Sequence, residues 1–416
     1  MTTGRLTNLH PALRHGWHPV ARSTEVTTDP VAVRLLGEAW VLARLDGRVT
    51  AFADRCPHRL APLSAGRVEH GELVCAYHGW RFAASGRCTA VPALGPGVPA
   101  PRRARAAAPW GVTERHGLVW LAPAEPVADI IDLPEADEPG FDSAWLPTSR
   151  TTACAGLLAD NFLDTAHLPF VHAGTIGAGE GTVVAPYRVE AEGAGFLFRM
   201  EQDVANPEDP GVAAGLRPLV QRRVSTYVYQ PPFMLRLRLE YPAAAITNTI
   251  LFCLQPEDLD ATGVHTLIVR DDLGGDPARL AEAVHFEQTV LEEDLALQER
   301  FTVNGLPLIP GGGAEPEEVS IRADAAGVAL RRALTALVAR AAPAPALAPA
   351  PALASAPAAG ARSAGQRISD TEPASAGSAS DLPCDRYAAP GDLATAREAR
   401  KVVPGAEQRR AGGGAR

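Results

Sequence analysis

The sequence lacks three features that would each assign it to a class of proteins. Its six cysteines in 416 residues are too few for a disulfide framework. No stretch has the roughly 18 uninterrupted apolar residues of a membrane helix, and residues 1–20 lack the apolar core of a signal peptide. A formal net charge of −9 disfavours nucleic acid and anionic membranes as partners, since both attract basic surfaces. We expect a cytoplasmic protein without a nucleic-acid or membrane partner.

A dinucleotide-binding fingerprint is also missing. Gly174, Gly177, Gly179 and Gly181 lie close together, but they do not form the Gly-x-Gly-x-x-Gly pattern that follows a strand in such sites. We interpret them as a flexible loop at the mouth of a pocket. Because the sequence shows no flavin or nicotinamide site, electrons are expected to arrive from a separate protein.

The sequence does contain two pairs of metal-binding residues. Cys56 and His58 form a Cys-x-His pair, and Cys75 and His78 form a Cys-x-x-His pair after sixteen intervening residues. Two thiolates can hold one iron of a [2Fe–2S] cluster while two imidazoles hold the other, which is the Rieske ligand set. A structural Cys2His2 zinc site is the alternative, but its usual order is two cysteines followed by two histidines. The four residues therefore predict a one-electron relay.

A second motif extends this interpretation. The pattern Asp-x-x-His-x4-His occurs at Asp164, His167 and His172. Together the two motifs resemble the Rieske non-haem iron oxygenases, and the resemblance weakens only in the C-terminal tail. It implies an α+β fold, with an antiparallel β Rieske [2Fe–2S] domain followed by a helix-grip catalytic domain, in which helices cover a curved antiparallel sheet.

Composition and periodicity divide the chain into five expected segments. They are an N-terminal segment (1–16), a Rieske domain (17–125), a linker (126–144), a catalytic domain with a mononuclear iron (145–340) and an Ala/Pro-rich tail (341–416). The linker lies where Pro, Glu and Asp cluster without periodicity. The tail is expected to be disordered because it cannot bury enough apolar surface to offset its ordering entropy.

Alternating and apolar runs predict strands on both sides of the linker. In the Rieske domain they cover 32–36, 39–45, 49–52 and 117–121, with a tight turn at Asp46-Gly47 and with Tyr77 and Trp80 shielding the cluster. In the catalytic domain they cover 187–202, 220–229, 234–241, 246–254 and 265–271. Helices are expected over 157–167, 286–302 and 323–338.

The mononuclear iron requires three protein ligands on one face, and two histidines with one carboxylate supply such a facial triad. We predict His167 and His172 as two of them, the alternative being histidines with ordinary polar partners. Asp164 and His167 are three positions apart and would share a helical face. Pro169 would disrupt that helix and turn His172 back toward His167.

The third ligand must come from a distant segment. Asp294 has mostly apolar neighbours three and four positions away on the predicted helix, and a carboxylate is costly to bury there unless it is paired or binds a metal. The carboxylate ligand of the family also lies in a Glu-Asp pair near the start of a late helix. The resemblance therefore favours Asp294, with Glu293 as the alternative ligand and a solvated helix face as the other possibility. Apart from that alternative, Glu292 and Glu293 have less apolar neighbours and are expected to be solvated.

The resemblance gives Asp164 a different role. In the family the acidic residue at this position bridges the mononuclear site to a Rieske histidine across a subunit boundary, which implies His78 as its partner and a head-to-tail homotrimer. A carboxylate that merely caps a helix is the alternative. Asp160 and Asn161 are expected to order the site by hydrogen bonding.

The resemblance thus implies a terminal oxygenase. Electrons from NAD(P)H would pass through a separate reductase, with or without a ferredoxin, to the Rieske cluster and the mononuclear Fe(II). Oxygen from O2 would enter an aromatic or related small molecule by hydroxylation or oxidative demethylation, with ring cis-dihydroxylation as an alternative. Two alternatives of other classes are an electron-transfer Rieske protein without oxygenase chemistry and a regulatory ligand-binding module. The apolar residues that are candidates to line the substrate pocket are Phe162, Leu168, Phe170, Phe233 and Phe252.

Overall fold

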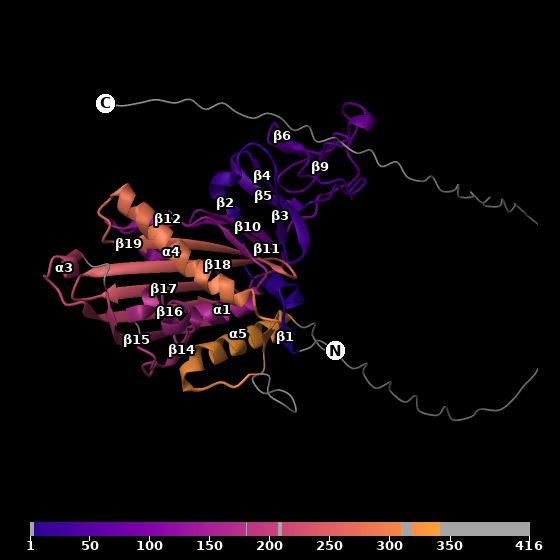
Figure 1. Cartoon of the computed structure of the whole chain (residues 1–416). Coiled ribbons are helices and arrows are strands. Elements are labelled where there is room, and N and C mark those ends of the chain that lie inside the picture. Colours follow the sequence, from indigo (N-terminus) through magenta and orange to yellow (C-terminus); the bar gives the residue numbers. More distant parts are fainter. Residues whose placement is uncertain (1–3, 180, 207–209, 309–317, 342–416) are drawn as a thin grey trace, which may run out of the picture. The chain divides into compact units, whose positions relative to one another are not determined.

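The structure is a computed structural model that describes residues 4–179, 181–206, 210–308 and 318–341. These residues form antiparallel sheets and a smaller number of α-helices (Figure 1), so the predicted α+β class is confirmed. Within these ranges no helix is both long enough and apolar enough to cross a membrane. The predicted disordered tail lies, from residue 342 onward, outside the described residues.

The first half of the chain consists of short strands in three sheets, with the orders β10-β11-β2, β3-β4-β5 and β6-β7-β8-β9. Their bounds are β2 (His18–Arg22), β3 (Val31–Leu35), β4 (Glu38–Leu45), β5 (Arg48–Ala53), β6 (Arg67–Glu69), β7 (Glu72–Val74), β8 (Arg81–Phe82), β9 (Cys88–Ala90), β10 (Gly111–Arg115) and β11 (Leu118–Ala122). Short 3-10 helices cover Pro11–His15, Ser23–Glu25, Pro92–Leu94 and Pro134–Asp137.

The predicted hairpin at Asp46-Gly47 is confirmed. Leu45 pairs with Arg48 across a two-residue turn, and both turn residues have positive φ, 50° at Asp46 and 80° at Gly47. This is the mirror-image turn that matches the twist of paired strands. It returns the chain as β5, which ends shortly before Cys56.

The second half contains an eight-stranded antiparallel sheet with the order β12-β19-β18-β17-β16-β15-β14, and β13 pairs beside β12 on β19. The strands are β12 (Asp142–Trp145), β13 (Ser149–Thr151), β14 (Val189–Glu192), β15 (Gly195–Ala205), β16 (Val220–Gln230), β17 (Met234–Tyr241), β18 (Ile246–Asp258) and β19 (Ala261–Arg270). A two-residue strand of this half, β20 (Leu306–Pro307), pairs with β1 (Arg5–Leu6).

Helices lie over one face of this sheet (Figure 1). They are α1 (Ala155–Leu163), α2 (Leu168–Val171), α4 (Pro277–Gln298) and α5 (Ala325–Ala341), whereas the short α3 (Pro210–Ala213) lies in the connection between β15 and β16; 3-10 turns cover Ile176–Gly179 and Arg322–Asp324. Almost every residue of α1 is buried, because α1 packs against both the sheet and α5. Aromatic side chains of the sheet complete the core beneath the helices, as where Phe198 stacks on Tyr227 at 4.4 Å.

Three predicted elements differ most from the observed bounds. The predicted helix 157–167 ends at Leu163, and Pro169 lies in the first turn of a separate helix, α2, where its missing N–H is tolerated. The predicted strand 187–202 is two strands, β14 and β15, joined by a turn at Gly193 with φ 58°. The predicted helix 286–302 starts nine residues earlier and ends four earlier as α4, because Asp276 caps its first turn by accepting from Ala278 N at 2.8 Å.

We expect acid to destabilise the protein through His265, which is 3% exposed and donates from Nε2 to Gln255 Oε1 at 2.9 Å. Burial, together with the charges of Arg22 and Arg150, lowers the pKa of His265 to about 3. The unfolded chain takes up this proton near pH 6.5 and the folded chain does not. The stabilisation is therefore complete above pH 6.5 and is lost as the pH falls, by about 1.4 kcal/mol per pH unit.

The measurement is the urea midpoint of unfolding at pH 7.5, 6 and 5. His265→Gln should flatten the pH dependence, whereas His285→Gln, at an exposed position of α4, should leave it unchanged. Equal pH slopes for the two variants would show that His265 does not carry the effect.

Candidate metal centres

The two Cys/His pairs lie on loops with the same backbone design. The carbonyl oxygen of Cys56 accepts from Leu60 N at 2.8 Å, and that of Cys75 accepts from Gly79 N at 3.0 Å. The residue that closes each loop has positive φ, 59° at Leu60 and 68° at Gly79. Glycine adopts this conformation without cost, whereas leucine rarely does. The backbone thus fixes both loops before any metal is considered.

The side chains of these loops converge. The rings of His58 and His78 lie 4.5 Å apart, and Trp80 stacks on His58 at 4.5 Å with 9° between the planes. The ring centroids of Tyr77 and His78 lie 3.9 Å apart, and Tyr77 is 64% exposed. Trp80 therefore packs against a ring of the pair, as expected of a residue that shields a cluster.

The chemistry of this site fits an iron–sulfur cluster. Cys56 and Cys75 are buried free thiols, and burial, with a hydrogen bond that the Cys56 thiol donates to Cys75, raises the pKa of Cys56 to about 11. The Nδ1 atom of His58 is buried without a hydrogen-bond partner among the described residues. A metal accounts for both the buried thiols and the buried imidazole nitrogen without a partner, because it binds thiolates and accepts the lone pair of a neutral imidazole.

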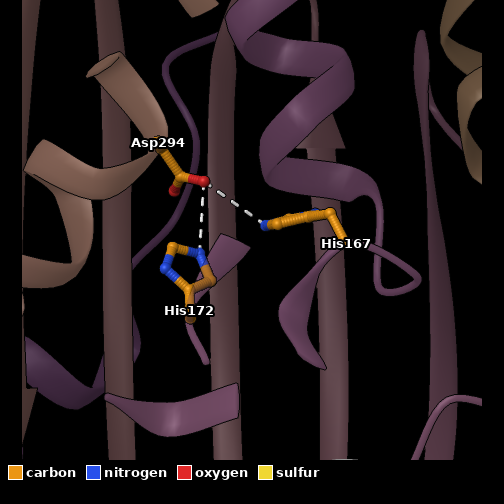
Figure 2. A group of neighbouring side chains, drawn as sticks. All are labelled: His167, His172 and Asp294. Atoms are coloured by element: carbon orange, nitrogen blue, oxygen red, sulfur yellow. Dashed lines mark ion pairs between the residues drawn. The ribbon is translucent and has the colours of Figure 1, made fainter. Parts of the chain in front are cut away.

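A second cluster forms where α2 meets α4 (Figure 2). The Asp294 Oδ1 atom lies 3.4 Å from His167 Nε2 and 3.2 Å from His172 Nε2. The side chains of Asp294, His167 and His172 are 8%, 13% and 1% exposed. His167 precedes α2 and His172 follows it, so this one-turn helix sets the separation of the two imidazoles.

These three residues fit a metal ion. Their candidate ligand atoms all lie within 4.8 Å of one another, yet Asp294 Oδ1 makes no well-formed hydrogen bond. Burial alone would lower the pKa of His167, but Asp164 and Asp294 raise it to about 9. Burial alone would raise the pKa of Asp294, but the two histidines lower it to about 2. A divalent cation can replace the protons that these groups share.

Asp164 contacts this site, but not across a helical face as predicted. It follows α1 in an extended conformation, with φ −79° and ψ 137°. Its Oδ1 accepts from Ala166 N at 2.9 Å, and its Oδ2 lies 3.3 Å from His167 Nδ1. The turn after Leu163, not a continuous helix, brings the two residues together. A carboxylate on Nδ1 orients the ring so that Nε2 faces Asp294.

Glu293 is not solvated as expected, because its side chain is 27% exposed and contacts the site. Its Oε2 atom lies 2.8 Å from His172 Nδ1 and accepts from Thr175 Oγ1 at 2.8 Å. It therefore holds the far side of His172, as Asp164 holds the far side of His167, while Asp294 faces both Nε2 atoms. The only signal in the sequence was that Glu293 adjoins Asp294. Glu292 is exposed, as expected.

Asp160 and Asn161 connect α1 to its neighbouring helices. Arg331 of α5 forms a two-pronged ion pair with Asp160, at 2.8 and 2.9 Å. A side chain at Gly327 would collide with Asp160 Oδ1, since its Cβ would lie only 2.6 Å away. Asn161 Oδ1 accepts from Gln298 Nε2 at 3.0 Å. Sequence reasoning missed Arg331, a charged residue on the buried stripe of α5.

A cavity of about 450 Å³ opens beside the His167, His172 and Asp294 cluster. Phe162, Leu168 and Phe252 line it as predicted, and the two phenylalanine rings stack at 4.4 Å. The prediction is wrong for two other residues, which do not line the cavity. Phe170 is 69% exposed because it lies on the outer side of α2, and Phe233 is 2% exposed within the core.

Comparisons with known proteins agree with this arrangement. Residues 16–106 match the model of the Rieske [2Fe-2S] domain, and residues 151–340 match the vanillate O-demethylase oxygenase C-terminal domain. Methylxanthine N1-demethylase NdmA of Pseudomonas putida is 28% identical over 337 residues, which span 78% of this chain and 89% of that protein. This chain belongs to the Rieske non-haem iron oxygenases.

Solved structures support the same assignment. The structure of Pseudomonas putida CBB5 NdmA with caffeine matches with a TM-score of 0.66 and 27% identity, covering 78% of this chain and 91% of that one. Dicamba monooxygenase bound to dicamba shares the fold, with a TM-score of 0.63, 22% identity and coverage of 78% and 97%. The oxygenase therefore uses a Rieske cluster, a mononuclear iron and O2.

We expect Asp294→Ala to lose the mononuclear iron while the two cluster irons remain, because this substitution removes the charge between His167 and His172. Iron analysis after anaerobic loading, with the visible spectrum of the cluster as an internal reference, measures both. Glu293→Gln should weaken binding of the mononuclear iron by about 10- to 100-fold.

Glu292→Gln is the matched control, since that side chain is exposed one position away, and it should retain all the iron. Full mononuclear iron in Asp294→Ala would contradict the ligand assignment. Wild-type enzyme that binds only the cluster irons would favour an electron-transfer protein instead.

Proposed function

We propose that this terminal oxygenase hydroxylates or oxidatively demethylates a ring-containing small molecule. Cys56, His58, Cys75 and His78 would hold the Rieske cluster, and the cluster of His167, His172 and Asp294 would hold the iron. The observation that carries the proposal is that those three ligand atoms converge at the wall of a largely apolar cavity. An electron-transfer protein has no need of such a cavity.

The protein's own residues position and isolate the reaction. When bound, the cluster supplies single electrons and the iron supplies O2 activation. Asp164 and Glu293 fix the two imidazoles through their Nδ1 atoms, so both Nε2 atoms stay directed at one point. The stacked pair Phe162 and Phe252 offers a flat apolar surface for a substrate ring and excludes water from it.

Demethylation is the more specific part of the proposal. It is supported by the match to the vanillate O-demethylase oxygenase domain and by the similarity to a methylxanthine demethylase. Ring cis-dihydroxylation is the alternative, and the two differ in where the oxygen atoms of O2 go. Demethylation carries one oxygen away in formaldehyde and the other in water, so the remaining product has methyl replaced by hydrogen, whereas dihydroxylation keeps both oxygen atoms in the product.

The proposed assembly is a head-to-tail homotrimer in which Asp164 receives electrons from the neighbouring subunit's cluster. Asp164 and His167 line a second cavity, of about 480 Å³, as well as the substrate cavity. Its rim carries the exposed apolar residues Phe301 and Val319. Tyr77, which is exposed beside His78, offers an aromatic ring with a polar hydroxyl tip to enter such a cavity.

The proposed electron donor is a separate NAD(P)H-dependent reductase, with or without a ferredoxin. An acidic surface on this partner is supported by four exposed arginines, none of which forms an ion pair with another described residue: Arg87, Arg102, Arg103 and Arg105. These arginines lie close together, since Arg87 and Arg105 pair as a β-bridge. Unpaired cysteines in the described residues agree with a cytoplasmic location.

The test of function is a single turnover with the fully loaded enzyme. The protein is reduced with dithionite, freed of reductant, and mixed with 18O2 and a panel of methoxy and N-methyl aromatic compounds. We expect formaldehyde and a product in which methyl is replaced by hydrogen, or one incorporated 18O on hydroxylation. Oxygen consumption without any oxygenated product across the panel would contradict the proposal.

The proposed path across the subunit boundary is tested by mixing two inactive variants. His78→Ala removes the relay and Asp294→Ala removes the iron, so each variant alone should be inactive. Oligomers formed from equal amounts of the two variants should recover about a quarter of wild-type activity. Half of their subunits keep the mononuclear iron, and in a random ring about half of these lie next to a neighbour with an intact cluster.

Metal analysis of each pure variant serves as the control, since each must retain the centre that it was not designed to lose. No recovered activity in verified mixed oligomers would show that electrons stay within one chain.

A further inference from the structure

One wall of the substrate cavity contains a buried acceptor without a hydrogen-bond partner. Asn248 is the third residue of β18, is 7% exposed and lines the cavity. Its Oδ1 atom is buried and has no hydrogen bond to any described residue. An unsatisfied buried acceptor costs about 1 to 3 kcal/mol. In the wall of a binding site, such an atom therefore indicates that the ligand supplies the missing donor.

The orientation of this amide follows from its neighbour on α4. Asn248 Nδ2 donates to Glu287 Oε1 at 3.4 Å. A carboxylate accepts hydrogen bonds and does not donate them when it is ionised, so the amide nitrogen must face Glu287 and the oxygen must face away. Asn248 therefore presents an acceptor, and its missing partner is a donor.

Arg270 could in principle donate to Asn248 Oδ1, but it already donates to another side chain. Arg270 is the cross-strand partner of Asn248, but its Nε and Nη2 atoms donate to Asp272 at 3.0 Å each. Arg223 and Glu287, which also line the cavity, each take part in further interactions. Two arginines and two carboxylates share this end of the cavity, so a neutral polar group fits it better than an ion does.

The distance from Asn248 to the proposed iron site can be read along α4. Glu287, which contacts Asn248, and Asp294 lie seven residues apart on this helix, which corresponds to about 10 Å of helical rise. Between them the wall is apolar and includes Ile250, Phe252 and Val290. The cavity is therefore apolar beside the reacting centre and polar about two helical turns away.

We propose that the substrate donates a hydrogen bond from an O–H or N–H group to Asn248 Oδ1, about 10 Å from its reacting methyl or ring carbon. This inference rests on the proposed function and narrows its substrate class. The substrate is a neutral, elongated molecule with an apolar end at the His167, His172 and Asp294 cluster and a phenol, alcohol, amide or lactam N–H at the other end. Asn248 is then a residue that determines specificity.

The experiment compares two probes that differ only in the donor. These are 4-hydroxy-4′-methoxybiphenyl and 4,4′-dimethoxybiphenyl, whose oxygens are about 10 Å apart, like the helical rise from Glu287 to Asp294. Binding to the fully loaded enzyme is measured under nitrogen by equilibrium dialysis, so that no turnover occurs. Wild-type enzyme should bind the hydroxy probe about 5- to 100-fold more tightly, because the methoxy group leaves the buried acceptor unsatisfied.

Two variants isolate the residue. Asn248→Leu should bind the two probes with equal affinity. Asn206→Leu makes the same chemical change at another residue that lines the cavity, where the amide already bonds to Gln221, and should keep the preference of the wild type.

Three outcomes would overturn the inference: equal affinities in the wild type, an unchanged preference in Asn248→Leu, or no binding of either probe. None of them bears on oxygen incorporation, so the single-turnover test of the proposed function succeeds or fails separately.

Discussion

The catalytic half of the structure depends on the burial of one carboxylate between two imidazoles. Asp294 is 8% exposed and lies within 3.4 Å of both His167 and His172. An unpaired carboxylate at this depth would cost several kcal/mol, so the two histidines must be held in place. That requirement explains why Asp164 and Glu293 each contact the Nδ1 atom of one ring, which leaves both Nε2 atoms directed at Asp294.

Holding these groups in turn requires that three helices have fixed positions. α1 ends immediately before Asp164, α2 separates the histidines and α4 carries the Glu-Asp pair. The ion pair of Arg331 with Asp160 joins α5 to α1, and the closeness of α5 depends on Gly327. The sheet beneath supplies the apolar surface against which the helices pack. The Rieske loops belong to a different core, which includes the buried thiols of Cys56 and Cys75.

Sequence reasoning predicted most strands at their observed positions, but it missed where some helices end. β17 was predicted with its observed ends, and the Asp46-Gly47 hairpin turn was predicted at its observed position. Both follow from local rules, namely side-chain alternation and the positive φ of a two-residue hairpin. The break after Leu163 was missed because residues 157–167 have no internal glycine or other local stop signal, and Pro169 suggested the interruption too late in the chain.

The sequence by itself determined the kinds of candidate ligand and their local spacing, since Cys-x-His, Cys-x-x-His and His-x4-His each lie within a single loop or turn. It also indicated a carboxylate from the segment around residue 294, because a charge among apolar helical neighbours needs a partner. Only the tertiary structure decided that Asp294 faces the imidazole Nε2 atoms while Glu293 faces the Nδ1 atom of His172. The same holds for Asn248, whose oxygen is left without a partner because its amide nitrogen donates to Glu287 and the neighbouring Arg270 donates to Asp272. These relations join residues that are distant in the chain, and their geometry depends on how α4 packs over the sheet, which no local pattern specifies.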